Sequence, residues 1–147
     1  MISCTEFIPA YSMLFDYLES KGGHAAVEQF WNEISDKYVA PELGPLVEEQ
    51  GIMGCWKYWG DAHTSEAADV TLSVDTEKQE MIIDMHFCPS KGRLIQLKHM
   101  TPYYDYCGHC MLIYKKVLEK YGITETRDHS HIDEAKCHRT YRKAQIA

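Results

Sequence analysis

The sequence lacks a long hydrophobic segment. No window approaches the roughly 18 uninterrupted apolar residues that a membrane-spanning helix requires. The N-terminal stretch also lacks the basic segment of a secretory signal peptide, and Glu6 and Asp16 interrupt its apolar residues. We therefore expect a soluble, cytoplasmic protein with no membrane partner.

Basic residues are scarce relative to acidic ones. The chain has 15 Lys and Arg against 22 Asp and Glu, which gives a formal net charge of −7 with histidine neutral. Nucleic-acid phosphates require a positive binding surface, and the one basic stretch, 136–144, is short and alternates like a strand. We therefore expect no nucleic-acid partner. The expected partner is a small-molecule ligand or substrate, and a homodimer stays open.

Long linkers, internal repeats and low-complexity tracts are absent from the 147 residues. Because this length suits one domain, we predict a single domain over 1–147. Its parts are mainly helical over 1–60, a hairpin over 69–88, helical over 91–121 and a second hairpin over 124–144.

Two spacings of apolar residues predict the fold class. A spacing of three to four predicts helices over 5–20, 24–38 and about 41–59, the last one started by two prolines. From residue 69 the spacing changes to two, which is typical of half-buried strands, and the same alternation returns over 124–144. Separate blocks of helices and hairpins predict an α+β fold, with N-terminal helices and a CxxC-bearing helix packed on an antiparallel sheet of about four strands.

The tetrapeptide Cys-Gly-His-Cys at 107–110 is the active-site sequence of protein disulfide isomerases. A thioredoxin fold would need a strand directly before it and a proline loop after it, and the chain has neither. A Thr-Pro pair at 101–102 instead predicts a helix from there to Tyr121. Cys107 and Cys110 would share one face of this helix, so a dithiol redox protein is one hypothesis.

Six cysteines and eight histidines are many for this length. The chain is long enough to build its own core, so we expect reduced thiols rather than disulfides. Four cysteines would converge if the two hairpins form one sheet beneath the CxxC helix: Cys88, Cys107, Cys110 and Cys137. These four are candidate ligands for zinc or iron, which favours a metal-binding or sensor domain without catalysis.

A cysteine nucleophile is the other chemistry that suits this cluster. Cys107 or Cys110 would attack an electrophilic carbon, while a histidine moves protons. The candidate histidines are His129 and His131, which share a strand face in the predicted third strand because the period of a strand is two.

Aromatic residues provide a candidate ligand pocket. Trp56 and Trp59 stand at helical spacing, and Tyr103 and Tyr106 lie just before the CxxC pair. They would form an apolar wall for a planar ligand, and packing in the core is the alternative.

The order of the cysteines resembles a known family. Cys88-Pro89 closes the second strand, a cysteine-bearing helix follows, and Cys137 lies in an Ala-Lys-Cys element of the last strand. This arrangement resembles the L-2-amino-thiazoline-4-carboxylic acid hydrolase-like proteins and, more distantly, the small-molecule-binding domains named after 4-vinyl reductase. The resemblance covers about 70–143. It implies a cysteine-dependent hydrolase that opens a small cyclic C=N compound of thiazoline or amidine type, with Cys110 or Cys107 as the nucleophile.

Overall fold

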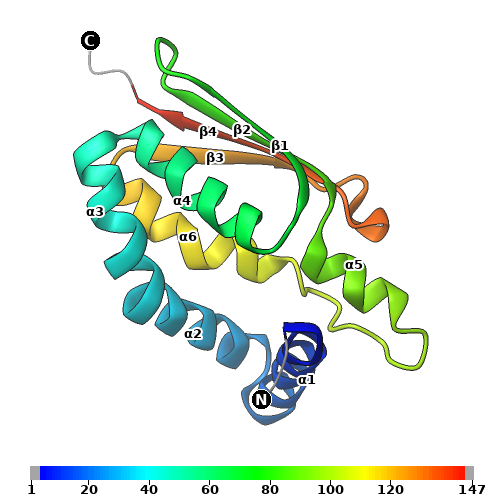
Figure 1. Cartoon of the computed structure of the whole chain (residues 1–147). Helices are drawn as coiled ribbons and strands as arrows, with labels where there is room; N and C mark the ends of the chain where they lie inside the picture. Colours follow the sequence, from blue (N-terminus) through cyan, green and yellow to red (C-terminus); the bar gives the residue numbers. More distant parts are fainter. Residues whose placement is uncertain (1–3, 145–147) are drawn as a thin grey trace.

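A computed structural model of the chain describes residues 4–144. Helices and strands follow one another in the blocks that the spacing predicts (Figure 1). In chain order the elements are α1 (Cys4–Gly22), α2 (His24–Ile34), the π-helical segment η1 (Ser35–Val39), α3 (Ala40–Gln50), α4 (Ile52–Ser65), β1 (Asp69–Asp75), β2 (Glu80–Phe87), α5 (Pro89–Gln96), α6 (Gly108–Lys120), β3 (Ile123–Asp128), the 3₁₀ helix η2 (Ile132–Glu134) and β4 (Cys137–Lys143).

The four strands form one sheet in the order β1-β2-β4-β3, and every neighbouring pair is antiparallel. The helices lie on one side of this sheet (Figure 1). The predicted α+β class, with helices on an antiparallel sheet of four strands, is therefore confirmed.

The period of two decides which residues of the sheet are buried. On β2, Met81, Ile83 and Met85 are buried, while their neighbours are more exposed. On β4, Arg139 and Tyr141 are buried in the same way. Because successive side chains of a strand point to opposite faces, these residues face the helices and their neighbours face solvent.

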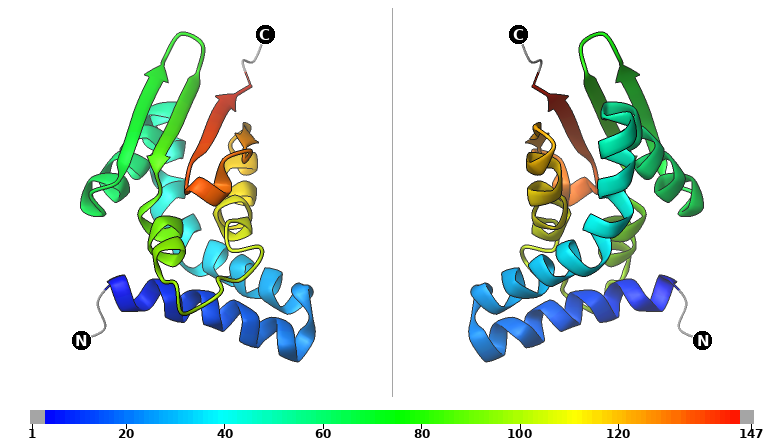
Figure 2. Two further views of the ribbon diagram at one scale, coloured as in Figure 1. Left: turned by 90° about the vertical axis from the view of Figure 1, so that its right-hand side faces the viewer. Right: turned by 90° about the vertical axis from the view of Figure 1, so that its left-hand side faces the viewer.

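Two helices connect the sheet to the rest of the core. Helix α4 contacts β1, β2 and β4, and α6 contacts β3 as well as α2, α3 and η1. Helices α1 and α2 lie at the end of the molecule opposite the β1–β2 turn (Figure 2), and α1 also contacts α5. The centre of the core therefore lies around α6, between the sheet and the N-terminal helices.

The predicted helix over 41–59 is in fact two helices, α3 and α4. The break lies at Gly51, which has φ of 59°. Glycine adopts this left-handed region without the penalty that a Cβ atom causes, so the chain can end α3 and start α4 in a new direction.

Two boundaries near the cysteines also differ from the prediction. The helix expected from 101–102 begins at Gly108, and the third strand ends at Asp128 instead of reaching residue 132. Residues 97–107 form a non-helical connection, and 129–136 form a loop that contains η2. Both changes alter which side chains can meet, as described below.

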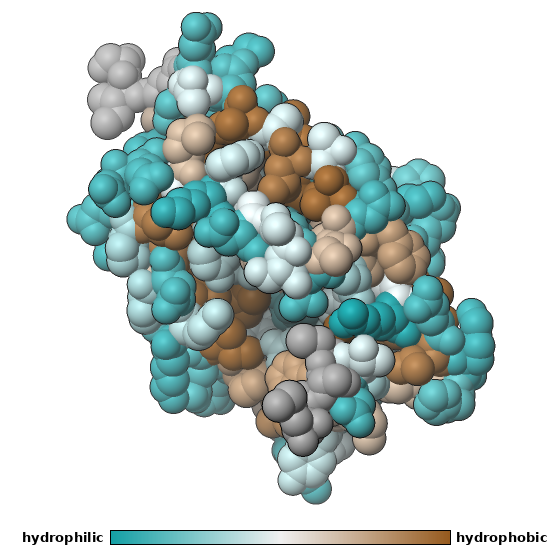
Figure 3. Space-filling model, in the orientation of Figure 1, coloured by the Kyte–Doolittle hydropathy of each residue, from teal (hydrophilic) through white to brown (hydrophobic). Residues whose placement is uncertain are grey.

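The surface has a mixed character. On the face shown in Figure 3, hydrophobic residues occur in separate groups among hydrophilic ones. Within residues 4–144 no helix combines the length and the apolar character that crossing a bilayer requires.

Candidate active site

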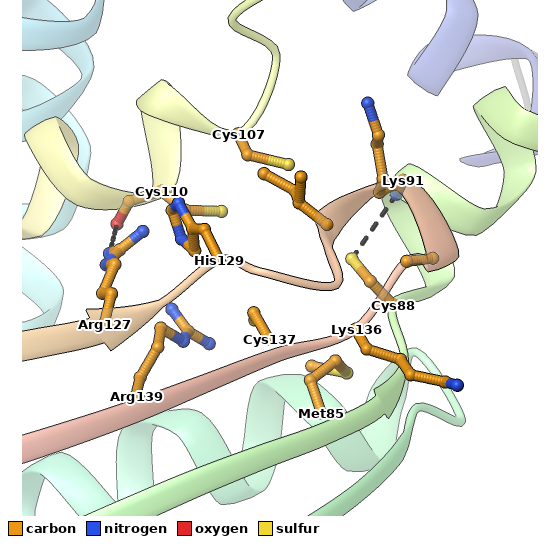
Figure 4. Close-up of a pocket in the computed structure, with 12 residues that line it drawn as sticks. Met85, Cys88, Lys91, Cys107, Cys110, Arg127, His129, Lys136, Cys137 and Arg139 are labelled. Atoms are coloured by element: carbon orange, nitrogen blue, oxygen red, sulfur yellow. Dashed lines mark hydrogen bonds between the residues drawn. The ribbon is translucent and has the colours of Figure 1, made fainter.

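A cavity of about 50 Å³ lies where the first turns of α5 and α6 approach one end of β2 and β4 (Figure 4). Its lining combines sulfur, cationic and apolar side chains: Met85, Cys88, Lys91, Cys107, Cys110, Arg127, His129, Ile132, Ala135, Lys136, Cys137 and Arg139. All four cysteines that the sequence predicts to converge therefore line one cavity.

The size of the cavity limits what it can hold. One buried water needs about 10–15 Å³ on this scale, so the cavity has room for a few atoms of that size. It can take a very small molecule or the reactive end of a larger one.

Two of the cysteines lie at helix N-caps. Cys88 caps α5, and its Sγ accepts a hydrogen bond from the Lys91 backbone N–H at 3.4 Å. Cys107 caps α6, so Cys110 lies in the first turn of that helix rather than near its middle. The partial positive charge of a helix N-terminus is strongest in this turn.

The turn before α6 explains why the helix starts so late. The Gly108 backbone N–H donates to the Asp105 carbonyl, and the Tyr106 N–H donates to the Tyr103 carbonyl. A Cβ atom at Gly108 would lie 2.5 Å from Oδ2 of Asp105. The glycine of the tetrapeptide therefore allows this tight turn to close against the Asp105 carboxylate.

Cys110 forms a pair with the neighbouring His109. The distance from Cys110 Sγ to His109 Nε2 is 3.3 Å. On the other side of the ring, His109 Nδ1 contacts the Tyr106 carbonyl oxygen, which can only accept, so Nδ1 carries a proton. The ring lies among Tyr11, Phe15 and Tyr106, and this packing fixes its orientation toward the sulfur.

The charges around Cys110 favour its thiolate. Burial alone would raise the pKa of this thiol, but the charge and hydrogen bond of His109, together with Arg139 and Arg127, lower the pKa to about 6. Burial likewise opposes the charged form of His109, but the Cys110 thiolate and the Tyr106 carbonyl raise its pKa above the usual value. These two shifts reinforce each other and favour a Cys110 thiolate beside a protonated His109 ring.

The other three thiols of the cavity have the opposite tendency. Burial and then the charge of Cys110 raise the pKa of Cys107 to about 12. Burial is also the main cause that raises the pKa values of Cys88 and Cys137. One of the four thiols is thus ionised near neutral pH, and it is Cys110.

Two arginines lie opposite each other on the sheet beneath Cys110. Arg127 of β3 and Arg139 of β4 are direct partners in the strand register. Arg127 donates from Nε to Glu125 Oε1 at 2.5 Å and from Nη2 to the Cys110 carbonyl at 2.6 Å. It therefore ties the first turn of α6 to β3 and holds the Cys110 backbone in place.

The two predicted catalytic histidines do not share a strand face, because β3 ends before both of them. His129 lines the cavity, where burial and the two arginines lower its pKa, so its ring is neutral near pH 7. His131 lies outside the cavity, beside a separate surface hollow, with its Nδ1 at 3.2 Å from Glu134 Oε1. The structure brings His129, and not His131, to the cysteines.

The predicted aromatic wall lies elsewhere. Trp59 is buried and stacks on Tyr141 at 4.7 Å between ring centroids, and Tyr103 and Tyr106 are buried in the core. Trp56 lies beside another hollow, between α4 and β1. None of these four candidate ligand-binding residues lines the cysteine cavity.

Two residues of the site, Arg127 and Arg139, were not among the sequence candidates, and the sequence indicates His109 only as a neighbour that could lower the pKa of Cys107. His109 lies inside the tetrapeptide, between the two cysteines. Arg139 has the same parity as Cys137 and Tyr141 on a strand, which places it on the buried face. The alternation of the strand therefore predicts that Arg139 is buried, provided that Tyr141 is known to be buried.

The four cysteines suit a metal by their chemistry, since thiolates bind zinc and iron well. Within residues 4–144, however, no three His, Cys, Asp or Glu side chains are arranged so that they could hold a metal ion. Metal binding would require rotation of these side chains and loss of the thiol protons.

No family model, no curated protein and no solved structure matches this chain. The cavity is therefore the feature of the molecule from which a function can be inferred.

Proposed function

We propose that this protein is a cysteine-dependent, hydrolase-like enzyme that acts on a small cyclic C=N compound of thiazoline or amidine type. The observation that carries the proposal is the pair formed by Cys110, which lines the cavity, and His109, whose Nε2 lies 3.3 Å from the Cys110 sulfur. A thiolate is the nucleophilic form of cysteine, and an adjacent imidazolium can return a proton. The likeness of Cys88-Pro89, Cys107 or Cys110, and Cys137 to the thiazoline hydrolase-like proteins supports the substrate class.

The chemistry begins with attack of the Cys110 thiolate on the carbon of the C=N group. The sulfur electron pair forms the new C–S bond, the π electrons move to nitrogen, and nitrogen takes a proton from the His109 imidazolium. The nitrogen electron pair then re-forms the C=N bond as the ring bond to the neighbouring heteroatom breaks, and that heteroatom keeps the electron pair of the broken bond. Water adds to the carbon, which is again trigonal, and the Cys110 thiolate leaves as the carbonyl forms. One proton of the water goes by way of His129 to the released heteroatom, and the other returns to His109. One water is consumed and one ring bond is cleaved.

His129 suits the water step. Its ring lines the same cavity and is neutral near pH 7 because burial, Arg127 and Arg139 lower its pKa. A neutral imidazole can take the proton of the attacking water. Free thiols at this site also require reducing conditions, so the proposal includes a cytoplasmic location.

Replacement of Cys110 by Ser tests the proposal. We expect Cys110→Ser to abolish ring opening of 2-amino-thiazoline-4-carboxylate and the fast reaction with iodoacetamide near pH 7, because a serine hydroxyl stays protonated there. Cys107→Ser is the matched control, since this thiol lines the same cavity but is protonated. Equal loss of iodoacetamide reactivity in both variants, or slow labelling of the wild type, would contradict the role of Cys110.

The convergence of Cys88, Cys107, Cys110 and Cys137 supports a second candidate, a zinc- or iron-binding domain without catalysis. Elemental analysis of protein purified without added metal separates the two. About one metal ion per chain, lost in Cys88→Ser and Cys137→Ser as well as in Cys110→Ser, would favour the second candidate.

A further inference from the structure

Arg139 is a buried cation that has no carboxylate partner in contact within residues 4–144, although the charge of the Cys110 thiolate acts on it. Its side chain is 5% exposed, it lines the cavity, and its Nε has no hydrogen-bond partner. No other hydrogen bond or ion pair of this side chain occurs in the described part of the chain. Because burying an unpaired charge is costly, such a group requires an explanation.

The neighbouring strand makes the imbalance larger. Arg139 lies directly opposite Arg127 in the β3–β4 register, and like charges in that position destabilise a sheet. Arg127 is neutralised by Glu125, through bonds of 2.5 and 2.9 Å from Nε and Nη2. The anions near these two guanidinium groups are thus Glu125 and the Cys110 thiolate, and the thiolate is shared with the His109 ring.

The cavity itself contains no acid. Its twelve lining residues include Lys91, Arg127, Lys136 and Arg139 but neither Asp nor Glu. Figure 4 shows the ammonium groups of Lys91 and Lys136 turned away from the cysteines, while the Arg139 guanidinium lies close to Cys110 and His129. In a chain of net charge −7, this cavity is a local concentration of positive charge.

We propose that the cavity contains an anion subsite in which Arg139 binds a carboxylate group of the ligand, beside Cys110. Nε–H and an adjacent Nη–H of a guanidinium form a planar fork that matches the two oxygens of a carboxylate. A carboxylate on one carbon also fits a cavity with room for only a few atoms. The inference rests on the proposed function for the reactivity of Cys110, and it adds the residue that selects the ligand.

The competing explanation is that Arg139 serves only to favour the Cys110 thiolate. The two roles differ in what they predict for reagents of unequal charge. A residue that only stabilises the thiolate changes the reaction of Cys110 with neutral and anionic reagents by the same factor. An anion subsite selects the anionic reagent, because it holds the carboxylate next to the sulfur.

Iodoacetate and iodoacetamide form the required pair, since they alkylate the same sulfur and differ in a carboxylate against a carboxamide. We expect the ratio of their rate constants at Cys110, divided by the same ratio for N-acetylcysteine, to be about tenfold or more in favour of iodoacetate. Arg139→Gln should return the divided ratio to about one. Arg142→Gln, the same charge change on the exposed face of β4, should leave it near the wild-type value.

Two outcomes would overturn the subsite: a divided ratio near one in the wild type, or an equal loss in Arg139→Gln and Arg142→Gln. Near-ultraviolet circular dichroism checks the fold of each variant. If Arg139→Gln does not fold, Arg139→Lys replaces it, and it should lose most of the preference because an ammonium lacks the planar fork.

Binding that does not depend on Cys110 reactivity separates this inference from the proposed function. In Cys110→Ser protein, saturation-transfer NMR should detect propionate and not propionamide, and adding Arg139→Gln should remove the propionate signal. Slow alkylation of the wild type together with Arg139-dependent propionate binding would reject the nucleophile and retain the subsite. Fast alkylation without propionate binding would retain the Cys110 nucleophile and reject the anion subsite.

Discussion

Both faces of β4 carry basic side chains, but those on the outer face are exposed and paired with acidic residues, whereas Arg139 on the inner face is buried. On the outer face, Arg142 pairs with Glu80 at 2.5 Å, and His138 lies 3.5 Å from Asp84 Oδ1. Both acidic partners belong to the adjacent strand β2. On the inner face, Arg139 is buried and unpaired, beside Cys137 and the cavity. Exposed pairs contribute about 0–1 kcal/mol, whereas a buried unpaired charge is costly. The outer charges are ordinary surface, and the inner charge is explained by a ligand.

The largest difference between the faces concerns stability, and adjacent isoleucines of β2 measure it. Ile83 is fully buried against the helices, while Ile82 points to the outer face. We expect Ile83→Ala to lower the free energy of unfolding by about 2–5 kcal/mol through lost burial and a new cavity. Ile82→Ala should lower it by about 1 kcal/mol or less.

Urea denaturation of both variants gives the comparison. If the two substitutions lower the free energy of unfolding by the same amount, the outer face is covered in solution. A homodimer, which the sequence leaves open, would explain such a result. A concentration-dependent midpoint for the wild type would then be required.

The next effect concerns two histidines, His109 on α6, which packs on the inner side of the sheet, and His138 on the outer face of β4. His109→Gln removes the cation that holds the Cys110 thiolate, while the burial that raises the pKa remains. The rate of alkylation follows the thiolate fraction, so in the wild type it should rise with pH through about 6. In His109→Gln this rise should move to higher pH, and the rate near pH 7 should fall about 100-fold if the pKa returns near its ordinary value.

His138→Gln is the control on the outer face, where the ring lies 3.5 Å from Asp84 Oδ1. Stopped-flow measurement of iodoacetamide consumption against pH follows both variants. An unchanged pH profile in His109→Gln would show that the two arginines alone are sufficient to ionise Cys110.

How far the sequence predicts this molecule depends on the range of the interaction involved. The helices and strands follow from spacing, because burial on one face imposes a period on the chain. The convergence of Cys88, Cys107, Cys110 and Cys137 also follows, since pairing of the two hairpins places them at one end of the sheet.

The boundaries and the chemistry depended on contacts that spacing does not carry. A Thr-Pro pair at 101–102 has the form of a helix start, but the helix begins only at Gly108, where the turn packs against the Asp105 carboxylate. The ionisation of Cys110 depends on a ring orientation of His109 that Tyr11 and Phe15 enforce from a distant part of the chain, together with the nearby Tyr106. Such tertiary effects have no local pattern in the sequence.

The smallest expected effect is a gain in stability from removing Arg139. Arg139→Met keeps similar volume and removes a buried charge that has no hydrogen-bonded partner at Nε, so we expect the free energy of unfolding to rise by about 1–3 kcal/mol. Arg142→Met on the outer face should lower it by about 1 kcal/mol or less, since it loses only an exposed pair. Thermal and urea unfolding of both variants measure the difference.

The pH dependence of this gain identifies its cause. Cys110 is a thiolate above about pH 6 and then partly compensates Arg139, because each favours the charged form of the other. Below that pH the thiol is neutral and no longer contributes a negative charge beside the guanidinium. The gain from Arg139→Met should therefore be larger at pH 5 than at pH 7.5, and a gain that grows with pH instead would mean that another anion compensates Arg139. Retention of such a destabilising residue is what a binding site requires, because the ligand carboxylate supplies the counter-charge that the fold withholds.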